Sequence, residues 1–263
     1  KPKPDTLGDS ISSNALDRNV SVAQEDGDIR TPLAGLFERC KEDAVLPLAQ
    51  ALGPVASLIP DCSGTLRLVE RKARQVLRQH PDKYGHLGEN LVSYVLLYTY
   101  ESKPPDRSPY HLMCEALREK RREHVKTWVD YIWGLLCALK RIPPATDRVL
   151  YRGCKLAFAA FGPNYAEGEE VVWYAFSSTC NKIKVQEQFT GPTGDRTLFH
   201  LEMQDRGVGR DIRDLSWFPA EAEILLPPGT LFRIEGSSDL GNGLTIVQMR
   251  QLGVEDPILD LNQ

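Results

Sequence analysis

Several features that define other protein classes are absent from this chain of 263 residues. No apolar run approaches the length of about 18 residues that a membrane-spanning helix needs. The net charge of −4 and the pI near 5.8 lack the basic excess that is typical of nucleic-acid binders. The sequence therefore excludes a membrane-spanning helix and disfavours a general nucleic-acid binder, and we expect neither a membrane nor a nucleic-acid partner.

Motifs for metals and for the common nucleotide folds are also missing. The five histidines have no ligand spacing such as H-E-x-x-H, and the cysteines form no C-x-x-C pair, so we expect no metal. No G-x-G-x-x-G motif or P-loop is present, so a dinucleotide would not be bound in the Rossmann manner. We expect the six cysteines to be reduced and mostly buried, which suits action in a cytosol. They are Cys40, Cys62, Cys114, Cys137, Cys154 and Cys180.

Composition divides the chain into three expected parts. Residues 1–30 contain no aromatic side chain and are rich in Ser, Asn, Asp and Pro, which predicts a flexible leader. The leader lacks the apolar core of a secretory signal, and its composition is shared by the delivery signals of injected bacterial effectors and by ordinary linkers. Residues 31–145 predict a helical lobe and residues 146–263 a β-rich core, which together make an α+β fold.

The apolar periodicity separates the last two parts. Apolar residues recur at helical spacing over 66–77 and 128–139, and the segment 87–101 is dense in Leu, Val and Tyr. From residue 148 onward, short β-branched and aromatic runs are separated by Gly, Pro and Asn, which predicts strands. The expected strands lie near 148–153, 171–179, 196–202, 222–226, 229–235 and 244–252.

Two short motifs allow other interpretations. His80-Pro81-Asp82 follows a basic helix and resembles the loop of a J-domain co-chaperone, but the next segment is aromatic rather than short and charged. The charged run 118–123 is either a contact surface for an acidic partner or a solvated helix face. We favour the solvated face, because opposite charges stand three or four residues apart.

Two carboxylates, Glu221 and Glu223, stand one residue apart directly before an apolar strand. In an extended segment their side chains would point to the same face, with the Cα atoms about 6–7 Å apart. One carboxylate could then steady a cationic sugar carbon while the other activates an attacking group, as in glycosyl chemistry. Taken alone, the pair is more typical of a solvated edge of a sheet.

Two upstream segments change that interpretation. The apolar strand at 149–153 carries Arg152, and the aromatic strand at 171–180 runs into Ser178 and Thr179. In this order, with the Glu pair, the three pieces resemble the Arg–Ser–Glu-x-Glu class of mono-ADP-ribosyltransferases. The resemblance covers about residues 87–252. The third hydroxyl position of the family motif is Cys180 here, which is a poorer hydrogen-bonding group.

The resemblance implies a core of two small sheets that form an NAD cleft, with the helical lobe packed on it. It implies an NAD-dependent enzyme of the glycosyltransferase class that moves ADP-ribose from NAD to a protein side chain. Glu223 would stabilise the cationic ribose, and Ser178 would hold Glu223 in place. Glu221 would face the acceptor as a base or orienting anion.

The resemblance also implies the residues that bind NAD. Arg152 would hold the phosphates or ribose with its planar cationic fork. Phe189 would stack near the nicotinamide, and Phe176 either lines the cleft or belongs to the core. The complete set expected to bind NAD is Arg152, Tyr151, Gly153, Ser178, Thr179, Phe189 and Glu223.

The acceptor and the setting stay open between alternatives. In this family a Glu at position 221 usually accompanies arginine acceptors, but the same pair could activate a threonine, and some bacterial effectors modify ubiquitin on threonine. We expect a monomeric bacterial effector or toxin that is secreted and acts on a protein in the host cytosol. The alternative class is a catalytically silent interaction module, which the intact Arg152, Ser178, Glu221 and Glu223 disfavour.

Overall fold

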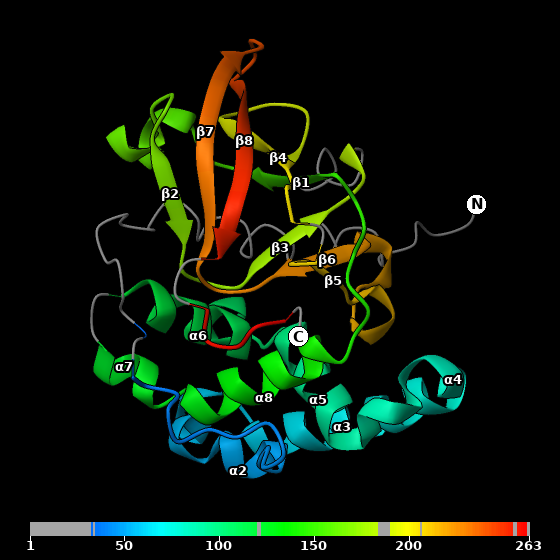
Figure 1. Ribbon diagram of the computed structural model, residues 1–263. Coiled ribbons are helices and arrows are strands. Elements are labelled where there is room, and N and C mark those ends of the chain that lie inside the picture. The colour runs from blue at the N-terminus through cyan, green and yellow to red at the C-terminus, as the bar shows by residue number, and fades with distance from the viewer. Residues whose placement is uncertain are drawn as a thin grey trace, which may run out of the picture.

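The computed structural model describes residues 33, 35–119, 122–183, 190–205, 207–254 and 257–261. A layer of helices lies on one side of a strongly twisted sheet (Figure 1). The expected leader, residues 1–30, lies outside the described residues. The helices are α2 (Leu48–Ala51), α3 (Cys62–Gln79), α4 (Pro81–Tyr84), α5 (Gly88–Tyr98), α6 (Pro109–Arg118), α7 (Arg122–Lys126) and α8 (Val129–Lys140).

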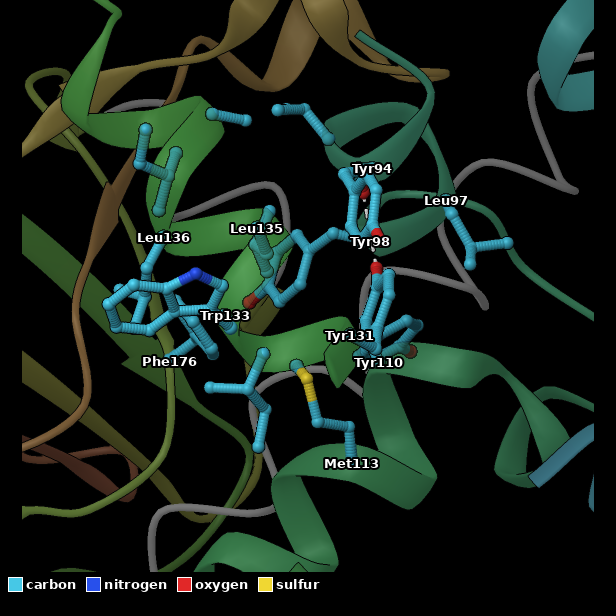
Figure 2. Close-up of a cluster of buried hydrophobic side chains, with 14 of the residues drawn as sticks. Tyr94, Leu97, Tyr98, Tyr110, Met113, Tyr131, Trp133, Leu135, Leu136 and Phe176 are labelled. Carbon is cyan, nitrogen blue, oxygen red and sulfur yellow. Dashed lines mark hydrogen bonds between the residues drawn. The ribbon is translucent and has the colours of Figure 1, made fainter. Parts of the chain in front are cut away.

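The helical layer is built around α5 and α8, whose side chains are almost all buried, as the apolar periodicity predicts. Tyr94 and Tyr131 stack with ring centroids 5.6 Å apart, and the Tyr131 hydroxyl donates to the Tyr94 carbonyl at 3.1 Å (Figure 2). Gly134 permits this approach, because a Cβ atom there would lie 2.2 Å from the Tyr94 ring. This close packing makes the helical layer a firm support for the sheet.

The strands form one hydrogen-bonded sheet in the order β2-β7-β8-β4-β1-β3-β6-β5. Neighbouring strands are antiparallel, except that β4 and β8 are parallel. The α+β class is confirmed, and the two expected small sheets are joined where Tyr151 of β1 pairs with Cys180 of β3. The strands are β1 (Val149–Cys154), β2 (Glu170–Trp173), β3 (Ser177–Cys180), β4 (Arg196–Glu202), β5 (Arg210–Asp211), β6 (Glu223–Leu226), β7 (Thr230–Asp239) and β8 (Leu244–Val254).

Two sequence predictions about elements are wrong. The expected strand 171–179 is two strands, because β2 pairs with β7 whereas β3 pairs with β6, and the chain crosses the sheet between them. The charged run 118–123 is not one helix face. Helix α6 ends at Arg118, Glu119 is extended, and α7 begins at Arg122.

The helical layer and the sheet share buried side chains. Phe176, Ile212, Leu215 and Leu225 all belong to the same buried cluster as α5 and α8. Figure 2 shows Phe176 among the helical aromatics. This shared core fixes the segment before β6 against the helices.

Two further expectations concern the state of the cysteines and the presence of membrane-spanning helices. All six cysteines have free thiols; Cys40 and Cys62 are half-buried and the other four are buried. None of the helices in the described ranges is long and apolar enough to cross a membrane.

Candidate active site

Three neighbouring strands, β1, β3 and β6, carry three of the predicted site residues, of which Arg152 is expected to bind NAD and Ser178 and Glu223 to be catalytic. Arg152 comes from β1, Ser178 from β3 and Glu223 from β6. Cys180 lies opposite Glu223, and Ser178 lies opposite Leu225. Opposite residues of an antiparallel pair share a face with their i+2 neighbours, so Ser178 and Glu223 are diagonal neighbours on one face. Glu223 is only 1% exposed, so its carboxylate lies away from bulk water.

Arg152 and Ser178 meet at a narrow cavity between the sheet and the helices. The Arg152 Nη1 donates to the Ser178 carbonyl at 3.1 Å, and the guanidinium carbon lies 5.6 Å from the centroid of the Trp173 ring. The Arg152 side chain is therefore held at the wall of the cavity. The lining residues are Tyr98, Tyr110, His111, Cys114, Arg118, Arg152, Phe176 and Ser178.

The segment that carries Glu221 is a turn, so the prediction of one extended segment over the Glu pair is wrong. Pro219–Glu221 form a 3₁₀ turn, and Ala222 adopts the left-handed conformation with φ 48° and ψ 46°. An alanine in this conformation is disfavoured by about 1–2 kcal/mol, and such strain gathers at functional sites. Only Glu223 belongs to the strand, yet Glu221 is buried as well, at 8% exposure.

The segment 212–221, here called the Glu221 loop, is held on the helical layer at Trp217. The Trp217 indole Nε1 donates to the Leu96 carbonyl at 3.0 Å, and its backbone N–H donates to Thr99 Oγ1 at 3.2 Å. The Lys72 ammonium lies 5.8 Å from the indole centroid, and Tyr100 packs edge-on against the ring. The Glu221 loop is therefore fixed to the helical layer at Trp217, upstream of Glu221 in the chain.

A second anchor of the Glu221 loop is Asp214. Its Oδ2 accepts from Lys83 Nζ at 2.7 Å and from the Tyr84 hydroxyl at 3.2 Å. Burial alone would raise the pKa of Asp214, but these two partners outweigh burial and hold the pKa below its ordinary value. Lys83 directly follows the His-Pro-Asp motif. In this fold the residue after the motif therefore helps to hold the Glu221 loop in place.

The other predicted residues have varied places. Thr179 is buried, and its hydroxyl donates to the Ile224 carbonyl at 2.7 Å, which ties β3 to β6. Tyr151 packs edge-on against His200, and Gly153 lies opposite Leu198 in the β1–β4 pair. Phe189 lies outside the described residues. The Cys180 thiol donates to the Lys182 carbonyl at 3.1 Å, so this departure from the motif is accommodated locally.

The helical wall of the cavity was not predicted from the sequence. His111, Cys114 and Arg118 stand at positions i, i+3 and i+7 of α6, so they share one helix face. This helical spacing is the feature of the sequence from which the helical wall could have been predicted. It is easily overlooked, because Arg118 also begins a charged run. Within the described ranges, no group of three or more His, Cys, Asp or Glu side chains is placed to hold a metal.

The sequence of this chain is similar to those of known proteins. Residues 70–254, more than half of the chain, match the family described as NAD:arginine ADP-ribosyltransferase. The chain is 27% identical over 131 residues to the mono(ADP-ribosyl)transferase SpvB of Salmonella typhimurium, which is 48% of this chain and 21% of that protein. It thus spans about a fifth of the length of this curated relative.

Solved structures share the fold. The ADP-ribosyltransferase HopU1 of Pseudomonas syringae pv. Tomato DC3000 has a TM-score of 0.57 at 21% identity, over 71% of this chain and 87% of that one. The eucaryotic mono-ADP-ribosyltransferase ART2.2 has a TM-score of 0.59 at 17% identity, over 87% of this chain and 94% of that one. The chain belongs to the NAD:arginine ADP-ribosyltransferase family.

Proposed function

We propose that this chain transfers ADP-ribose from NAD to an arginine side chain of a target protein. The supporting observation is the placement of Arg152, Ser178 and Glu223 on three adjacent strands, with Glu221 on the turn beside them. The family description names arginine as acceptor, which favours arginine over the threonine of ubiquitin.

Each residue has a distinct task in this proposal. The bond between nicotinamide and the ribose carbon breaks, and nicotinamide leaves with the bonding electron pair. The buried Glu223 stabilises the positive charge that develops on the ribose, and it does so better than an exposed carboxylate because water does not screen it. The acceptor nitrogen then bonds to the same carbon and gives up a proton; in this proposal Glu221 orients the acceptor and accepts that proton.

Arg152 should contribute mainly to NAD affinity. Replacing it with alanine removes a charged hydrogen-bond donor from the cavity wall, so the dissociation constant for NAD should rise about 10-fold or more. Calorimetry of the purified variant measures this constant. Arg148→Ala is the matched control, because Arg148 is exposed just before the same strand. Equal NAD affinity in the Arg152 and Arg148 variants would contradict the place given to the dinucleotide.

Trp217 should act through the Glu221 loop. Trp217→Phe keeps an aromatic ring but removes the bond to the Leu96 carbonyl, so transfer to protein should fall about 3–10-fold while NAD hydrolysis changes much less. Trp133→Phe is the control, because it removes the same kind of bond, to the Lys41 carbonyl at 3.1 Å, and Trp133 does not line the cavity that Arg152 and Ser178 share. If both variants lost transfer and hydrolysis alike, the loop would have no positioning role.

The proposal also includes the biological setting in which the chain acts. SpvB and HopU1 are both bacterial, which supports a bacterial effector or toxin that acts on a protein of a host cell. The acceptor is tested by incubating the chain with NAD and either an arginine-rich protein or ubiquitin, then fragmenting the products in a mass spectrometer. We expect ADP-ribose on arginine. Modification of ubiquitin threonine alone would replace this acceptor assignment.

A further inference from the structure

Helix α3 carries four arginines on one side, far from the active-site cavity in the sequence and so far without a role. Arg67, Arg71, Arg74 and Arg78 stand at positions i, i+4, i+7 and i+11, so they form one row along the helix, here called the arginine stripe. All four side chains are exposed. At 1.5 Å of rise per residue, the stripe is about 16 Å long.

The arginine stripe points away from the protein interior. The opposite side of α3 carries Thr65, Val69, Ala73 and Val76, which are buried. The helix packs on α5 and lies at the outer side of the helical layer (Figure 1). The stripe is therefore a surface that a second molecule can reach.

Most of the arginine stripe has no counter-charge. Arg74 forms an ion pair with Glu89, whereas the other three arginines form none with any residue that the structure describes. Exposed arginines of the sheet differ, because Arg233 and Arg250 both pair with carboxylates. Like charges three or four residues apart on a helix repel each other, and an acidic partner would relieve that repulsion.

The side of α3 next to the arginine stripe leads to the Glu221 loop. Leu68 and Lys72 each follow an arginine of the stripe by one residue, and they share this neighbouring side because they stand four residues apart. The Lys72 ammonium lies 5.8 Å from the Trp217 indole centroid, and Leu68 is 37% exposed. A surface that covers the stripe and Leu68 would therefore extend toward the loop that carries Glu221.

We propose that the arginine stripe binds an acidic surface of the target protein and so brings the acceptor side chain to the Glu221 loop. This inference rests on the proposed function. A membrane fits less well, because a helix that lies in a membrane needs a free apolar side, and the apolar side of α3 is buried. A nucleic acid also fits less well, because the whole chain carries a net charge of −4.

The test compares two acceptor peptides that differ in the charge of their tails. Each has one arginine and a Gly/Ser linker of about 20 residues, which spans about 25 Å, followed by about eight glutamates or about eight glutamines. The wild-type chain should show a KM about 10-fold lower for the glutamate peptide, because a bound tail raises the local concentration of the acceptor. High ionic strength should remove this difference. Fluorescence anisotropy measures the dissociation constants of the same peptides independently of catalysis.

Reversing the charge of the arginine stripe should abolish the preference. The variant Arg67→Glu/Arg71→Glu/Arg78→Glu changes the three unpaired arginines and leaves the ion pair of Arg74. Its KM and dissociation constant for the glutamate peptide should rise about 10-fold or more. Its values for the glutamine peptide and its NAD hydrolysis should stay at the wild-type level. If this protein fails to fold, the same three positions changed to glutamine decide the point.

The matched control is Lys103→Glu/Lys126→Glu/Lys155→Glu. It changes the net charge by the same amount at three exposed positions outside α3, so it should keep the preference for the glutamate peptide. An equal loss in this control would indicate a general effect of net charge and would overturn the role of the stripe.

The remaining outcomes separate this inference from the function on which it rests. Equal KM values and equal dissociation constants for the two peptides, in a wild-type chain that hydrolyses NAD, overturn the docking surface and leave the function standing. Wild-type chain that binds phosphatidylserine vesicles but does not distinguish the peptides also overturns it, and assigns the stripe to a membrane surface. Wild-type chain that binds the glutamate peptide but releases no nicotinamide from NAD overturns the function itself.

Discussion

Replacing Glu223 with glutamine should lower both NAD hydrolysis and transfer about 10²–10³-fold while the fold persists. The substitution keeps the shape of the side chain at the start of β6 but removes its charge, and the cationic ribose loses its counter-ion. The effect should be large because Glu223 is buried, where a charge acts with little screening by water. Free nicotinamide and labelled protein measure the two activities, and circular dichroism monitors the fold.

The control for this prediction is Glu202→Gln. Glu202 ends β4, is exposed, and stands in an ion pair with Arg250, so both activities should stay at the wild-type level. A folded Glu223→Gln protein that releases nicotinamide at the wild-type rate would show that this carboxylate is not the electrostatic stabiliser.

Glu221→Gln should separate the two activities. Glu223 remains, so the nicotinamide bond still breaks and water can capture the ribose. A protein acceptor loses the group that orients it and takes its proton, so transfer should fall about 10²-fold or more. Hydrolysis should fall far less. Measuring nicotinamide and labelled protein in the same samples gives the ratio directly.

The opposite result has a clear meaning. If Glu221→Gln lowered hydrolysis and transfer in parallel, the two carboxylates would share one role. The proposed separation of tasks is based on the backbone, since Glu221 lies on the turn and Glu223 on the strand, with the left-handed Ala222 between them.

Local patterns predicted much of the fold. Apolar residues at helical spacing placed α3 and α8, and short β-branched and aromatic runs placed β1, β4 and β6 close to their observed ends. These elements bury a continuous stripe or face, so residues close together in the sequence are enough to predict them. The order of Arg152, Ser178 and Glu223 along the chain indicated the site, and the sheet brings their strands together.

The parts that sequence reasoning missed depend on contacts between distant residues. The shape of the Glu221 loop depends on the bond from Trp217 to the Leu96 carbonyl, across 121 positions of the chain. Arg210 is another example. It is buried in β5 and donates to the Leu139 and Leu261 carbonyls, while burial lowers its pKa to about 10. No periodicity marks a residue whose partners lie so far away.

The central claim is that this chain cleaves NAD and gives the ADP-ribose to protein. The most direct test incubates the wild-type protein with NAD and arginine-rich acceptor proteins, and counts free nicotinamide against ADP-ribose found on the acceptor. We expect nicotinamide release that depends on the chain, together with ADP-ribose on arginine. A folded wild-type protein that releases no nicotinamide with any acceptor would contradict the claim and leave a silent interaction module with the transferase fold.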